Sequence, residues 1–117
     1  MTLALARPIG RDHSIPASRV ATAVLTLTGP AASLRTHTAT AWASITFSGW
    51  CHQLVLRFTG PFAIGEGERF IAALPEHEFA LRGALVVDAA VTRVARTQAI
   101  DPPHLEVTVE LLVLDED

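Results

Sequence analysis

Five polar side chains fall on one face of the last two predicted strands, and this face is the chain's strongest candidate for chemistry. A register that opposes Arg96 to His104 places Asp88 diagonal to Glu110. Two carboxylates this close raise each other's affinity for protons, and apolar neighbours reduce their solvation further. The cluster comprises Asp88, Glu110, Glu106, His104 and Arg96, with Val86 and Leu112 beside the two acids.

An environment of this kind suits a general acid or a metal ion. The candidate catalytic residues are therefore Asp88, Glu110 and His104. The competing interpretation is an ordinary solvent-facing sheet surface, or an interface with a second subunit. If Asp88 is buried, it needs a partner such as Arg57, a backbone N–H group or a proton shared with Glu110.

Three other sequence features that could suggest chemistry fit structural roles better. Cys51 and His52 are neighbours on a predicted strand, so their side chains point to opposite faces and make a poor nucleophile–base pair. The acids and histidine of residues 76–78 are badly spaced for one metal ion. The glycines of residues 60–67 lack the lysine of a phosphate loop. We expect no cofactor and no metal.

Two amphipathic strands must position the polar cluster. In the strand predicted at residues 78–97, the odd positions from Phe79 to Val91 other than Gly83 are all apolar, which is the period of a strand, and Gly83 falls in phase where the strand can bend. Residues 104–114 alternate in the same way. One face of this pair is expected to meet the core and the other to meet water.

The N-terminal half is predicted to add a strand and a hairpin. Residues 20–28 alternate alanine or leucine with threonine, which favours a strand. Residues 38–47 and 52–59 are read as a hairpin around a turn at 48–51. A register opposing Phe47 to His52 sets Ile45 against Leu54, Ala43 against Leu56, Ala41 against Phe58, and Trp42 across from Arg57.

One short helix is predicted at residues 66–74, with acidic residues in its first turn and Pro75 ending it. The fold class is therefore α+β: an antiparallel sheet of about five strands with this helix on one face. The alternative is a ferredoxin-like α/β sandwich, which requires residues 30–36 to be helical.

The composition describes one domain of 117 residues, half of them apolar and 18% charged. Residues 1–19 are expected to form a basic N-terminal arm and residues 20–117 a single domain. All nine cations are arginine, which favours a GC-rich, bacterial genome. A single cysteine, Cys51, allows no internal disulfide, so the expected location is the cytoplasm. A short apolar run at residues 20–27 is too short to span a membrane.

Charge is divided unevenly along the chain. Residues 1–60 carry five arginines and one acid, for a charge of +4, whereas residues 61–117 carry four arginines and eleven acids, for a charge of −7. Halves of opposite charge pair within the fold or between subunits, and an acidic total argues against nucleic-acid binding.

The sequence therefore favours a non-catalytic binding or assembly module. We expect it to form a homodimer, with Arg7, Arg11 or Arg19 of one copy meeting the acidic half of the other. The alternative is a small enzyme that uses the carboxylate pair Asp88 and Glu110.

Overall fold

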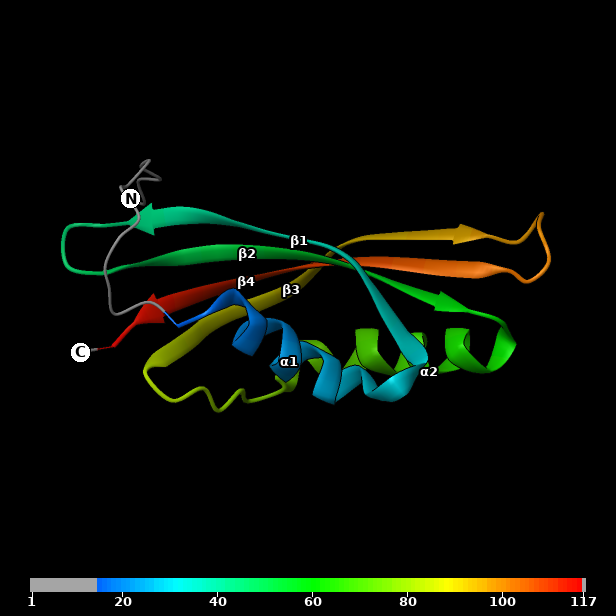
Figure 1. Cartoon of the computed structure of the whole chain (residues 1–117), viewed down its shortest axis with the longest axis horizontal. Helices are drawn as coiled ribbons and strands as arrows, with labels where there is room; N and C mark the ends of the chain where they lie inside the picture. The colour runs from blue at the N-terminus through cyan, green and yellow to red at the C-terminus, as the bar shows by residue number, and fades with distance from the viewer. Residues whose placement is uncertain (1–14, 117) are drawn as a thin grey trace.

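In the computed structural model, residues 15–116 form a four-stranded antiparallel sheet with two helices on one of its faces (Figure 1). This confirms the α+β class, with four strands in place of about five and two helices in place of one. In chain order the elements are α1 (Ala17–Thr28), a 3₁₀ turn (Gly29–Ala31), β1 (Ala32–Ala43), β2 (Ser48–Thr59), α2 (Pro61–Ala73), a second 3₁₀ turn (Leu74–Glu76), β3 (Ala84–Thr97) and β4 (His104–Asp115).

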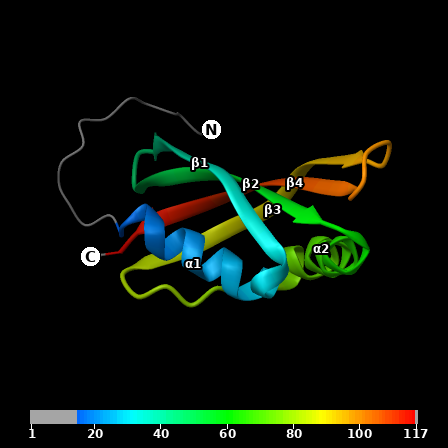
Figure 2. The same cartoon turned by 45° about the vertical axis from the view of Figure 1, so that its right-hand side comes forward.

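The sheet has the strand order β1-β2-β4-β3, so the two hairpins join through β2 and β4 at the centre. Both helices lie along the same face of the sheet, as the turned view in Figure 2 also shows. The ferredoxin-like alternative is not confirmed. Residues 30–36, which it needs as a helix, contain the end of the first 3₁₀ turn and the start of β1.

The prediction of a strand at residues 20–28 was wrong, because this segment belongs to α1. Its sequence satisfies two periods at once. The alternating positions suit a strand, but Val20, Ala21, Val24 and Thr28 also recur at helical spacing, and these four are the buried residues of α1. Packing of that stripe on the sheet outweighs the low helix propensity of the threonines on the exposed side.

The first hairpin turns at residues 44–47 and not at 48–51. Ser44 closes the turn: its backbone N–H donates to the Phe47 carbonyl at 2.8 Å, and its hydroxyl accepts from the Phe47 N–H at 3.2 Å. The predicted register was therefore wrong. In the observed register His37 pairs with Leu54, Leu34 with Leu56, Ala32 with Phe58, Trp42 with Gly49, and Arg57 with Ser33, so Trp42 and Arg57 are not opposite each other.

The long strand predicted at residues 78–97 begins only at Ala84. Gly83 has φ +86°, a left-handed conformation that interrupts an extended chain and that glycine adopts without strain. From Ala89 to Val91 the predicted register with β4 is confirmed, since Ala89 pairs with Leu111 and Val91 pairs with Val109. At the loop end the prediction is one residue off, because a bulge lies between Val91 and Arg93 and Thr97 pairs with His104. At the open end a second bulge, between Val86 and Asp88, shifts the register by one residue in the other direction, so Val86 pairs with Val113.

Helix α2 begins at Pro61, five residues before the predicted start at residue 66. It approaches the sheet most closely at Gly67, where a Cβ atom would lie 2.8 Å from side-chain carbons of Phe58 and Leu105. The glycine that allows this close approach therefore belongs to the helix, whereas Gly83 lies in the turn before β3, next to Ile15.

The core fills the space between the helices and the sheet. Even-numbered residues of β2 and odd-numbered residues of β4 supply its floor, while Val20, Val24, Phe70 and Leu74 close it from the helix side. The fully buried floor residues are Leu54, Leu56, Phe58, Leu105, Val107, Val109 and Leu111.

The molecule is elongated, with extents of 48 × 24 × 24 Å. Its radius of gyration of 15.2 Å exceeds the value of about 13 Å typical of a domain of this length. The β1–β2 and β3–β4 loops lie at opposite ends of the long axis (Figure 1). Large apolar side chains at these loops are exposed to solvent: Ile45 and Phe47 at one end and Ile100 at the other.

Candidate functional site

The face of the sheet opposite the helices is the open face, and it carries most of the polar side chains predicted to do chemistry. It is formed by the odd-numbered residues of β2 and the even-numbered residues of β4, flanked by β1 and β3. No helix among residues 15–116 packs on this face (Figure 1).

The carboxylate pair lies on this face in the predicted diagonal arrangement. Asp88 pairs with Leu112, and Glu110 pairs with Ala90, so the two acids are offset by two residues across neighbouring strands. Asp88 is exposed, whereas Glu110 is half-buried and accepts a hydrogen bond from Gln53 Nε2 at 3.2 Å. Asp88 therefore does not need the buried partner considered for it from the sequence.

Cys51 of β2 pairs with Leu112 of β4. It therefore lies in the row of paired residues next to the row that contains Glu110. Burial raises the pKa of its thiol, and the negative charges of Glu110 and Asp88 raise it further. A thiol in this environment stays protonated at neutral pH and is a poor nucleophile. The protonated thiol next to the two acids therefore does not favour thiolate chemistry at this place.

His104 does not join the acid pair. It lies at the first position of β4, six residues before Glu110, which corresponds to roughly 20 Å along a strand. The three candidate catalytic residues therefore do not form one site. Arg96 is also separated from it, because the shifted register turns its side chain to the helix face, where Nη1 lies 2.9 Å from Glu68 of α2.

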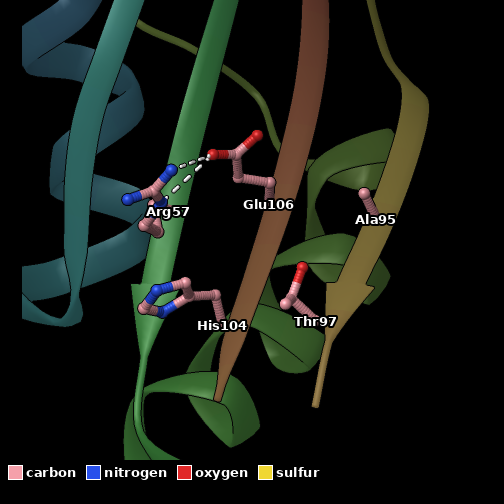
Figure 3. A pocket seen from close by; sticks show the side chains of 5 residues that line it. All are labelled: Arg57, Ala95, Thr97, His104 and Glu106. Atoms are coloured by element: carbon pink, nitrogen blue, oxygen red, sulfur yellow. Dashed lines mark hydrogen bonds and ion pairs between the residues drawn. The ribbon is translucent and has the colours of Figure 1, made fainter. Parts of the chain in front are cut away.

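His104 instead lines a shallow pocket of about 100 Å³ at the end of β2 and β4, together with Arg57, Ala95, Thr97 and Glu106 (Figure 3). Arg57 donates to Glu106 Oε2 through both Nε, at 3.1 Å, and Nη2, at 2.7 Å. The ion pair neutralises the pocket's two charged groups. The sequence pattern of each hairpin carries no signal for this ion pair, because Arg57 and Glu106 meet only when β2 pairs with β4.

The Nδ1 atom of His104 is buried and has no hydrogen-bond partner among the described residues. An unsatisfied ring nitrogen costs about 1–3 kcal/mol unless a small molecule such as water meets it. The pocket has room for a few waters, but it is smaller than the roughly 300–1,000 Å³ typical of ligand sites.

A second feature missed from the sequence is a pair of histidines on the helix face. His37 Nε2 lies 2.9 Å from His52 Nδ1, and their ring centroids are 5.1 Å apart. His52 is buried, and burial together with His37 lowers its pKa to about 4. Burial also lowers the pKa of His37. One ring donates to the other, so the pair is a neutral, structural hydrogen bond at neutral pH.

The remaining candidates lie apart from each other. His77 packs edge-on against Phe79 with centroids 4.5 Å apart, in the segment before β3. Within residues 15–116, no group of three or more histidine, cysteine or acidic side chains is arranged to hold a metal ion. Within the same residues, no helix has both the length and the apolar character needed to cross a membrane.

The opposite charges of the two halves meet partly inside the chain, through Arg57 and Glu106. Arg19 donates through Nη1 to the carbonyl oxygen of Arg82 at 3.0 Å, which ties the start of α1 to the turn before β3. Arg7 and Arg11, the other residues predicted to contact a second copy, lie outside the described residues.

Comparison with known proteins gives a likeness of fold. No protein-family model and no curated protein matches this sequence. Among solved structures, the chain is similar to one from the virion of a native gene transfer agent particle, with a TM-score of 0.61 and 16% sequence identity. The likeness covers 82% of this chain and 87% of that chain.

Proposed function

We propose that this chain is a non-catalytic structural subunit that associates with copies of itself in a larger particle. The observation that carries this proposal is the likeness of fold to a chain of a gene transfer agent virion, which extends over most of both chains. A virion is built from many protein chains, and the similar chain is one of those that make up such a particle.

The surface of the molecule supports the same function. The sheet has helices on one face only, and large apolar side chains are exposed at the β1–β2 loop and along β3: Ile45, Phe47, Leu85 and Val87. Ile45 is as exposed as in an extended peptide, at 102%. Apolar groups at the ends and on the open side of an elongated subunit suit contacts with neighbouring subunits.

The candidate catalytic groups give weaker support to an enzyme. Asp88 and Glu110 are separated from His104 along β4, the nearby thiol is protonated, and the pocket at Arg57 is small. Enzyme sites bring their acid, base and ligand cavity together in one place.

The alternative remains a small enzyme that uses the acid pair, and its diagonal placement on β3 and β4 is the observation in its favour. Under that alternative, Asp88→Asn and Glu110→Gln each abolish a cation-dependent or acid–base activity while the fold persists. Under the proposed function, neither substitution changes the mass of the assembly.

The proposal is tested by light scattering coupled to size-exclusion chromatography at micromolar concentration and physiological salt. We expect the mass to reach at least that of a homodimer, twice the 12.5 kDa of one chain. A mass near 12.5 kDa at every concentration would refute self-association.

A further inference from the structure

The two edges of the sheet differ in how well they are protected against pairing with another strand. The strand order leaves β1 and β3 at the edges. An edge strand presents a row of unpaired N–H and C=O groups, and natural sheets protect such rows with charges, proline or bulges.

Strand β3 carries this protection. It has one bulge between Val86 and Asp88 and another between Val91 and Arg93. It also carries a charged side chain at Asp88, Arg93 and Arg96. A second strand laid along this edge would lose register twice and would meet charges of both signs.

Strand β1 lacks this protection over its last eight residues. Its one register shift lies between Leu34 and Thr36, and the next eight residues, Thr36–Ala43, pair with β2 without interruption. Those eight residues include no Asp, Glu, Lys, Arg, Pro or Gly. Thr36, Thr38 and Thr40 are exposed, and within residues 15–116 β1 pairs with β2 alone.

We propose that Thr36–Ala43 is a self-pairing edge, on which β1 of a second copy adds antiparallel to form a continuous eight-stranded sheet. This inference rests on the proposed function, because it names the surface through which the subunit associates. A two-fold axis perpendicular to the sheet generates the pair and keeps the helices of both copies on the same side.

The register follows from the faces. Under this axis, paired residues must have the same parity, since residues that oppose each other on neighbouring strands point to the same side. When the two-fold axis passes through Ala39, nearly all of the uninterrupted segment Thr36–Ala43 is paired. It sets Thr38 against Thr40 twice and Thr36 against Trp42, and threonine pairs across strands are favourable.

Charge favours a second β1 over any other strand of this chain. In the Ala39 register Arg35 of each copy lies opposite Ala43 of the other, so the two guanidinium groups are roughly 27 Å apart at 3.3–3.4 Å per residue. That separation is several Debye lengths at physiological salt, where the Debye length is about 8 Å. An uncharged edge thus meets an uncharged edge, and no charge is buried.

Lysine at the edge tests the pairing. Thr38→Lys combined with Thr40→Lys places four like charges at the centre of the paired strands, in two mutually opposed pairs. We expect sedimentation velocity to show at least a tenfold increase in the dissociation constant. The matched control is Thr92→Lys on β3, which is also an exposed threonine on an edge strand, and it should leave the constant unchanged.

A cysteine on the axis tests the register. In a Cys51→Ser background, Ala39→Cys should give a disulfide-linked dimer under mild oxidant, because paired residues on antiparallel strands have Cα atoms within disulfide reach. Thr92→Cys in the same background should give none. Circular dichroism confirms that each variant retains the fold.

The outcomes separate this inference from the proposed function. If the wild type associates but neither the lysine pair nor the Ala39 cysteine behaves as expected, the β1 edge is not the contact and the structural role stands. If the wild type stays monomeric at concentrations up to about 100 μM, both the pairing of the β1 edges and the proposed function are wrong.

Discussion

The ion pair between Arg57 and Glu106 is the strongest polar contact on the open face. Both side chains are about one-third exposed, so solvent screens much of the attraction. A double-mutant cycle with Arg57→Ala and Glu106→Gln should give a coupling free energy of about 0.5–1 kcal/mol in urea denaturation. Arg69 and Glu66, at 3.5 Å and with Arg69 81% exposed, form the control pair and should couple by less than about 0.5 kcal/mol. Equal coupling in both pairs would contradict this ranking.

His52 should make stability depend on pH. A histidine titrates near pH 6.5 in an unfolded chain, but burial and His37 lower the folded-state pKa of His52 to about 4. Between these values the unfolded chain binds more protons, so the free energy of unfolding falls as the pH is lowered through this window. We expect a loss of about 2–3 kcal/mol between pH 7.5 and pH 4.5 from this group.

The measurement compares the pH dependence of the wild type with that of His52→Gln, which removes the buried titrating group. His77→Gln, at an exposed position, is the control and should keep the wild-type slope. An identical slope in wild type and His52→Gln would show that acid destabilisation arises elsewhere.

Asp88→Asn should be nearly silent in stability. From the sequence alone, a buried Asp88 would make this substitution cost about 1–3 kcal/mol through an unsatisfied partner. The carboxylate is exposed, and surface substitutions of this kind stay within about 0.5 kcal/mol. Thermal melting at pH 5 and pH 8 checks this, and a drop of several degrees at both values would mean that Asp88 has a structural partner.

The contact between α2 and the sheet depends on Gly67 having no side chain. Gly67→Ala places a methyl group against Phe58 and Leu105 and should destabilise the fold by about 1–3 kcal/mol. Gly65→Ala lies two residues away in the same helix with nothing within 4 Å, so it should stabilise by about 0.5–1 kcal/mol. Chemical denaturation measures the free energy of unfolding of both variants. A change of the same sign in both would contradict this packing.

The elements show which parts of the fold could be predicted from the sequence. The C-terminal hairpin was predicted with its central register, because residues 104–111 alternate strictly and the pairing of Ala89 and Val91 with Leu111 and Val109 places apolar side chains on one face. Residues 20–28 were not, since an apolar–threonine alternation fits a helix and a strand equally well and only the sheet beneath decides between them. The local sequence does not indicate the bulges at Val87 and Thr92, so the position of Arg96 on the helix face could not be predicted.

The candidate site was predicted in part for the same reason. The two acids share one hairpin, so their diagonal placement could be predicted from local pairing. The contacts of Arg57 with Glu106 and of His37 with His52 depend on the pairing of β2 with β4 and on the observed turn at residues 44–47. Alternation along one strand carries no information about which strand lies next to it.

At the scale of the whole molecule, we propose that this elongated two-layer domain associates with its own copies as a structural subunit. The most direct measurement is sedimentation equilibrium of the full chain over a hundredfold range of concentration at physiological salt. We expect an average mass that rises with concentration from 12.5 kDa toward at least twice that value. A mass that stays at 12.5 kDa over the whole range would contradict it.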